Sequence, residues 1–328
     1  MIDGHPLRRL LGQAQKDFRT GATLRDVLRY SIAGYLIGTA NPAAGERWQQ
    51  VKSRMTPEQK AAHWKAVDRT ATAWEPRFAD AAVRAFNHDK REILAIVNDA
   101  KSKARASKAS IAWQDTLLSV EDYLNMGGAD NWRSQFTPAM KGIITDQGKR
   151  WAADLGMTFD VQNFFAQDWF DEYTLKFAQQ INATTLDELG RMFQQAQSEG
   201  WSVPTMQKHL TTLFDQWSKG DVTPEEFDWY TSRMPPYRTE MIARTETIRS
   251  SNAGSEELFN EWGVQQKEWL ATKDDRVRDD HLAADGQVVG IDEPFIVGGY
   301  EADFPGDPNL PPEESINCRC TVLPVMGE

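Results

Sequence analysis

The chain has little cysteine, a deficit of positive charge and no long apolar run. Cys318 and Cys320 are the only cysteines among its 328 residues. Because cysteines separated by one residue rarely pair with each other, we expect no disulfide framework and a reducing compartment. The net charge of -11 and the pI near 5.1 argue against a surface devoted throughout to binding phosphates. Any contact with nucleic acid is expected to be local.

Export and membrane signals are also lacking. Residues 1–12 are polar and carry Arg8 and Arg9, with no long apolar run behind them, so no signal peptide is expected. The most apolar stretch, residues 30–38, is about half as long as a segment that spans a bilayer. We therefore expect a soluble protein that is cytoplasmic when made and has no membrane partner.

Familiar catalytic motifs are missing as well. The sequence has no G-x-S-x-G elbow, no phosphate-binding P-loop and no H-E-x-x-H zinc motif. The sequence also suggests no cysteine–histidine pair with a third residue that we expect to orient it. The sequence therefore favours a protein that is not an enzyme.

The first two-thirds of the chain carry strong helical signals. Hydroxyl residues before prolines mark helix starts, and two of them complete capping boxes, Thr56 with Gln59 and Thr223 with Glu226. Thr137 before Pro138 and Thr185 with Glu188 predict similar starts, and Ser202 before Pro204 predicts a weaker one. Pro76 and the pair at 127–128 are expected to end helices. Apolar residues also recur at helical spacing, for example at Phe78, Ala82, Ala85, Phe86, Ile93, Ile96, Val97 and Ala100.

We expect an α+β protein with three regions. Residues 1–130 form a helical arm of unassigned role, residues 131–234 a helical bundle region, and residues 235–328 a small, loop-rich α+β domain. The boundary is set at Met234-Pro235-Pro236, because a double proline cannot continue a helix. No strand is expected before about residue 235.

The C-terminal region alternates between segments with helix, strand and loop signals. Residues 237–262 predict a helix with a stripe of small and polar residues suited to close packing, ended by Gly263. A strand over 266–272, a short helix near 273–281 and an extended piece at 287–289 follow. Residues 290–312, rich in glycine and proline, predict a long irregular loop, and residues 316–325 a final strand.

Twelve tryptophans and one basic stretch raise the question of nucleic acid. Tryptophans can stack on single-stranded bases, but several here have acidic neighbours, which favours packing between helices. Between residues 84 and 110, seven positive side chains stand against three negative ones. We treat them as a candidate surface for DNA or an acidic partner, the alternative being a solvated face. This basic surface comprises Arg84, Lys90, Arg91, Lys101, Lys103, Arg105 and Lys108.

A series of motifs occurs in order over the last ninety or so residues. It starts with A-R-T-E-T at 243–247 and K-E-W at 267–269 and ends with P-G-D-P at 305–308 and N-C-R-C at 317–320. This order resembles the phage Mu F-like minor head proteins of the head-morphogenesis family. The residues between and within these motifs that carry the resemblance are Arg276, Arg278, Asp279, His281, Asp285, Gly286, Asn317 and Arg319.

The resemblance implies a minor capsid protein of a tailed bacteriophage, acting at or near the portal in procapsid assembly, DNA packaging or DNA delivery. Its partners would be the portal protein, other capsid or scaffolding proteins and double-stranded DNA bound without sequence preference. Its location would be the head interior or portal vertex of the virion, and the host cytoplasm during assembly. The alternative is a toxin-like enzyme carried in the head, either a nuclease or an ADP-ribosyltransferase, because Mu F-like regions are joined to toxin domains in some longer chains.

Three residues of these motifs suit a metal. His281, Cys318 and Cys320 are ligand types that zinc prefers, but structural zinc normally has four ligands. Asp279 or Asp285 could complete the set. In the alternative, the cysteines pack as small apolar residues, while Arg276, Arg278, Asp279 and His281 tie down the long loop. We favour packing, so no cofactor is expected.

Overall fold

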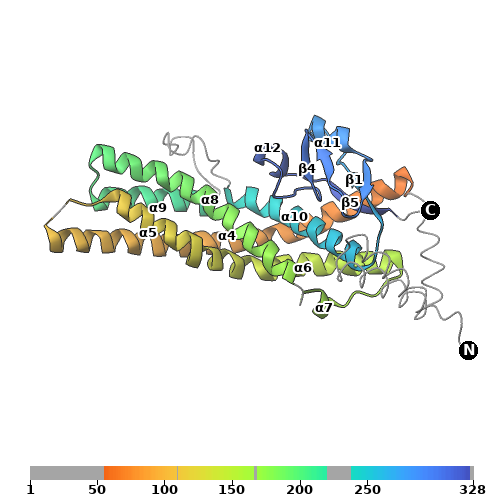
Figure 1. The fold of residues 1–328 in the computed structure, drawn as a ribbon, viewed down its shortest axis with the longest axis horizontal. Helices are drawn as coiled ribbons and strands as arrows, with labels where there is room; N and C mark the ends of the chain where they lie inside the picture. Colours follow the sequence, from red (N-terminus) through yellow and green to blue (C-terminus); the bar gives the residue numbers. More distant parts are fainter. Residues whose placement is uncertain (1–54, 109, 166–167, 220–237, 326–328) are drawn as a thin grey trace, which may run out of the picture. The chain divides into compact units, whose positions relative to one another are not determined.

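The computed structural model describes residues 55–108, 110–165, 168–219 and 238–325. Its fold is α+β, as predicted, with strands only in the C-terminal part of these described ranges (Figure 1). The helices before the first strand are α4 (Pro57–Ser107), α5 (Trp113–Tyr123), the π-helical turn η1 (Leu124–Gly128), α6 (Ala129–Leu155), α7 (Val161–Phe165), α8 (Asp168–Glu199), α9 (Val203–Lys219) and α10 (Arg238–Glu261).

The C-terminal part alternates short strands with short helices. In chain order the elements are β1 (Gln266–Leu270), α11 (Asp279–Ala284), β2 (Val288–Gly290), β3 (Phe295–Val297), β4 (Tyr300–Ala302), α12 (Pro312–Ser315) and β5 (Thr321–Val325). Strand β1 lies between β2 and β5, and both pairings are antiparallel, with Trp269 opposite Val322. Strands β3 and β4 form a separate hairpin.

The chain divides into two compact units, each discontinuous in sequence. Unit 1 contains the described residues up to Ala71, Ile143–Phe164 and the chain from Ile248 onward. Unit 2 contains Thr72–Gly142 and Phe165–Thr247.

Unit 2 has an aromatic core. Phe86 lies edge-on to Trp132 at 4.9 Å between ring centroids, and Trp132 and Phe136 pack at 5.4 Å. The buried Asp89 beside them accepts hydrogen bonds from Tyr123, Asn131 and Trp132, so its carboxylate is compensated. Among the described residues of the helical region, four tryptophans are buried, in agreement with the packing interpretation: Trp113, Trp132 and Trp217 in unit 2 and Trp151 in unit 1.

Unit 1 packs the second half of α10 closely against other helices. Trp151 stacks on His63 at 4.5 Å and donates a hydrogen bond from Nε1 to the hydroxyl of Ser255. A Cβ added to Gly254 would lie 2.7 Å from Ile144, so only glycine permits this approach. The small residues of α10 therefore pack as their pattern predicts.

Several predicted helix ends are confirmed. Thr56 and Gln59 exchange the two hydrogen bonds of a capping box at the start of α4. The hydroxyl of Ser202 accepts a bond from the backbone N–H of Thr205 at the start of α9. Helix α10 ends before Gly263, which has a φ of +70°, with the N–H of Val264 bonded back to the carbonyl of Phe259.

Two predictions based on proline were wrong. Helix α4 continues through Pro76, and Thr137-Pro138 lies inside α6 instead of starting a helix. An internal proline removes one N–H and blocks the carbonyl four residues earlier. Here both prolines, and both Thr72 and Ser134 four residues before them, are exposed, so water can hydrate the released carbonyls.

The glycine pair at 127–128 and Thr185 also behave differently from expectation. The chain passes through η1 into α6 without a break, and the side chain of Asn182 donates a 2.6 Å hydrogen bond to the carbonyl of Leu124. That hydrogen bond gives the carbonyl of Leu124 a side-chain partner where the helix changes from α-helical to π-helical hydrogen bonding. Thr185 lies inside α8, where its hydroxyl bonds to the carbonyl of Ile181.

The segment predicted as an irregular loop over 290–312 contains the β3–β4 hairpin. Its two-residue turn is Gly298-Gly299, with φ values of +58° and +88°, the conformation that a tight hairpin turn requires. The final strand is also shorter than predicted, because β5 begins at Thr321 and both cysteines precede it.

Some predictions concern residues outside the described ranges. They include the arm residues before 55, the apolar stretch 30–38, the capping box from Thr223 to Glu226 and the boundary at Met234-Pro235-Pro236. Within the described ranges, no helix combines the length and apolarity needed to cross a membrane.

Candidate functional site

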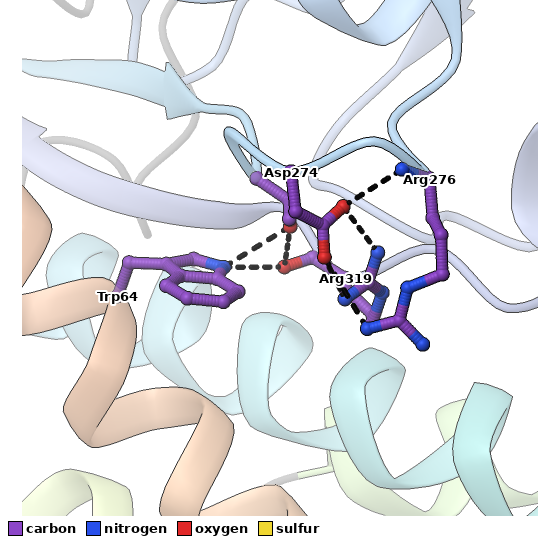
Figure 2. A network of polar contacts seen from close by, with 5 residues as sticks. Trp64, Asp274, Arg276 and Arg319 are labelled. Carbon is purple, nitrogen blue, oxygen red and sulfur yellow. Dashed lines mark hydrogen bonds and ion pairs between the residues drawn. The ribbon is translucent and has the colours of Figure 1, made fainter.

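A charged network joins the segment after β1 to the segment before β5. Asp274 accepts two hydrogen bonds of 2.7 Å from the guanidinium of Arg319, and a third from the backbone N–H of Arg276 (Figure 2). The hydrogen bond from Arg319 lowers the pKa of Asp274 well below its usual value. The guanidinium and the carboxylate therefore form a strong, bidentate ion pair.

Helix α4 contributes to the same network. The indole N–H of Trp64 points at the hydroxyl of Thr272 and the carbonyl of Arg319, at 3.1 and 3.2 Å (Figure 2). One turn earlier, Lys60 forms an ion pair with Glu268 of β1, whose side chain is only 5% exposed. A pocket of about 340 Å³ opens beside these residues, and its lining also includes Lys273 paired with Asp285.

The three predicted metal ligands come together in the interior. The ligand atoms of His281 from α11 and of Cys318 and Cys320 lie within 4.8 Å of one another, and all three residues are buried. His281 Nδ1 lies 3.4 Å from Cys320 Sγ and 3.6 Å from Cys318 Sγ. We call these three residues the His–Cys cluster. The suggested fourth ligands do not join it, because Asp279 is exposed and Asp285 is engaged by Lys273 and the N–H of Ala271.

The other ring nitrogen of His281 faces a carboxylate. Nε2 lies 3.0 Å from Oε2 of Glu314, on α12, but neither atom makes a well-formed hydrogen bond. The hydrogen bond between the thiols lowers the pKa of Cys318 and raises the pKa of Cys320 well above its usual value. Arg278 holds the adjacent backbone through the carbonyl of Ile316. Asn317, between that carbonyl and Cys318, has a φ of +56°, a conformation that asparagine tolerates.

The P-G-D-P loop is held from α10. Arg249 donates a 2.7 Å hydrogen bond from Nε to the carbonyl of Gly306. Asn252, fully buried, donates to the carbonyls of Pro305 and Cys320 and accepts from Thr321 and Val322. One amide thus links a helix, the loop and β5.

The lysine of the K-E-W motif is buried. Lys267 donates hydrogen bonds to the carboxylate of Glu256, on α10, and to the carbonyl of Asp303. Burial raises the pKa of Glu256 to about 8, and the nearby ammonium offsets part of that shift.

Three further motif residues differ in their roles. Gly286 takes a φ of +79° and bonds back to the carbonyl of Trp269, which forms the acidic-glycine turn after Asp285. Arg276 is mostly exposed and pairs with Asp274, while Asp279 is an exposed residue in the first turn of α11. The predicted loop over 290–312 is therefore tied by Arg249 and Asn252 of α10, whereas Arg278 bonds to Ile316, just after that loop, and Arg276 pairs with Asp274.

The basic surface lies on α4, except for Lys108, which directly follows that helix, and most of its members are exposed. Lys90 is an exception, because it is partly buried and forms an ion pair with Asp215. Lys103 pairs with Asp99, one turn earlier on the same helix. The remaining members are Arg84, Arg91, Lys101, Arg105 and Lys108, all exposed.

The motif residues of the C-terminal region therefore link strands, loop and helix to one another. Comparison with known families agrees with this assignment of the motifs: residues 187–323 match the model described as Phage Mu protein F like protein. This part of the chain is therefore similar to the phage Mu F-like family. Similarity to this head-morphogenesis family implies association with the virion.

Individual relatives show how far the similarity extends. The uncharacterized protein YqbB of Bacillus subtilis is 24% identical over 223 residues, which are 58% of this chain and 73% of YqbB. The NAD(+)--arginine ADP-ribosyltransferase EFV of Enterococcus faecalis is 36% identical over 89 residues, 26% of this chain and 18% of that protein. An uncharacterized protein of Haemophilus influenzae is 30% identical over 89 residues, 27% of this chain and 17% of that protein. No solved structure matches the chain.

Proposed function

We propose that the chain is a minor capsid protein of a tailed bacteriophage that acts at or near the portal. Its role would be in procapsid assembly, DNA packaging or DNA delivery. The observation that carries the proposal is the family match over residues 187–323, which contains the motifs that the sequence presents in order.

We also propose that its role is structural and not enzymatic. Most of the charged motif residues are engaged with one another or with backbone groups, as in the pairs of Asp274 with Arg319 and of Lys267 with Glu256. A general acid or base must instead reach a substrate at hydrogen-bond distance. The short match to an ADP-ribosyltransferase covers 18% of that protein, too little to carry its activity to this chain.

The test is assembly with the partners encoded by the same phage. The chain would be produced with the major capsid protein and scaffold, with and without the portal protein, and procapsids would be isolated by sedimentation. We expect a few copies per particle when the portal is present and a large decrease when it is omitted. Absence from particles in both cases would contradict the proposal, as would hydrolysis of NAD or nicking of plasmid DNA by the purified chain.

A further inference from the structure

The His–Cys cluster has the geometry of a metal centre. We propose that His281, Cys318 and Cys320 bind one zinc ion, and that Glu314 orients the histidine. This inference depends on the positions of these side chains and not on the role in the phage head.

The spacing of the ligand atoms fits a tetrahedral ion. With a zinc–sulfur distance of about 2.3 Å and a zinc–nitrogen distance of about 2.0 to 2.1 Å, tetrahedral angles place sulfur and nitrogen about 3.5 Å apart. The two observed separations from His281 Nδ1 are 3.4 Å to Cys320 and 3.6 Å to Cys318. Both therefore match what one shared ion would impose.

Two sulfurs approach the same nitrogen. A neutral imidazole nitrogen has one lone pair, so it can accept one good hydrogen bond from a thiol. Without an ion, a hydrogen bond between the thiols and a second one to Nδ1 would be needed to bring both sulfurs to this nitrogen. A metal ion bound by all three atoms explains both contacts.

The surroundings of His281 complete the pattern. Histidines that bind a metal through one nitrogen usually direct the other toward a carboxylate or carbonyl. Here Nε2 lies 3.0 Å from Glu314, whose residue is 9% exposed, and His281 itself is 1% exposed. With the proton on Nε2, Nδ1 presents its lone pair to the two sulfurs.

The three ligands come from two separate segments of the C-terminal region. His281 lies on α11, while Cys318 and Cys320 lie in the segment that leads into β5. An ion held among them would join these elements, and its binding free energy would add to the stability of unit 1. Three protein ligands leave a fourth coordination position for water.

Metal content and spectroscopy of the full chain test the proposal. We expect about one zinc per chain after purification without chelator, and X-ray absorption showing two sulfur and two nitrogen or oxygen neighbours. Cobalt substitution should give the visible bands of tetrahedral cobalt with thiolate charge transfer. Cys318→Ser with Cys320→Ser should abolish both signals, and Glu314→Gln should weaken zinc affinity about 10- to 100-fold.

Matched controls separate loss of metal from loss of fold. His209→Asn removes a histidine in unit 2 and should leave the zinc content unchanged. Circular dichroism of each variant checks that the helices remain, and zinc titration of the chelator-treated parent chain tests binding without any substitution. A parent chain that is folded, contains no zinc and takes up none on titration overturns the proposal, as does zinc retained by the double serine variant.

Discussion

The side chain of Asn252 offers the sharpest test of how the motif region is held together. It makes four hydrogen bonds, to the carbonyls of Pro305 and Cys320 and with the hydroxyl of Thr321 and the N–H of Val322. Asn252→Ala removes all four from a fully buried position. The substitution should therefore weaken the attachment of both the P-G-D-P loop and β5 to α10.

The size of the effect follows from the groups left behind. A buried polar group without a partner costs about 1 to 3 kcal/mol, although the Thr321 hydroxyl can rotate and water can enter the space vacated by the amide. We expect Asn252→Ala to lower the free energy of unfolding of this region by about 3 to 5 kcal/mol. A domain is stable by only about 5 to 15 kcal/mol, so local opening should become frequent.

Hydrogen exchange read by mass spectrometry measures this directly, on peptides that cover β1 and β5 in the full chain. Asn163→Ala is the matched control, since Asn163 is an exposed residue of α7 in unit 1 and its loss should change stability by less than about 0.5 kcal/mol. Asn252→Asp keeps an acceptor but places a negative charge against two carbonyls, so it should also destabilise at neutral pH. Exchange in Asn252→Ala that equals exchange in the Asn163 control would refute the reasoning.

Three other predictions concern charge. Asp274→Asn should lower the free energy of unfolding by about 1 kcal/mol because it weakens the pair with Arg319, whereas Asp279→Asn, at an exposed position, should lower it by less than about 0.5 kcal/mol. Equal losses for the two variants in urea unfolding would contradict this prediction. Burial raises the pKa of Glu256 from 4.5 to about 8, so the stability contributed by its protonated form should be full below pH 4.5 and lost as the pH rises through 8. Glu256→Gln should remove this loss of stability, whereas Glu313→Gln, at an exposed position, should not. The chain should bind DNA without sequence preference, and the slope of log affinity against log salt concentration should fall by about 0.9 for each phosphate contact that is lost. Charge reversal of Lys101, Lys103 and Arg105 of the basic surface should abolish this binding, whereas charge reversal of the exposed Lys208 should leave it unchanged.

Local signals predicted local structure well. The capping box at Thr56, the end of α10 before Gly263 and the strands β1 and β5 each depend on a few adjacent residues, and the structure contains them. The β3–β4 hairpin was missed although its Gly-Gly turn is a known hairpin signal, because the surrounding prolines favoured a loop. Pro76 was wrongly predicted to end a helix, because packing of the buried face of α4, which includes Phe78 and Ala82, outweighs the local cost of the proline.

The pairing of distant side chains could not be predicted in the same way. Arg319 was expected to matter, but its partner Asp274 is 45 residues away and has acidic neighbours that look equally suitable in sequence. The His–Cys cluster was considered as a metal site because its residues are ligand types that zinc prefers, although packing was favoured, and the structure brings the three residues together. Asn252 carries no such signal, since a buried amide is recognised only by the groups that surround it.

The C-terminal motifs depend on residues far upstream of them. The carboxylate of Glu268 is almost fully buried and its cationic partner is Lys60, 208 residues earlier in the chain. A buried charge that loses its partner is strongly destabilising, so β1 requires the first turns of α4 for its own stability. The same helix supplies Trp64, whose indole N–H bonds to the segment that precedes β5. Unit 1 therefore depends on residues 57–71 for its stability, although the family match begins only at residue 187.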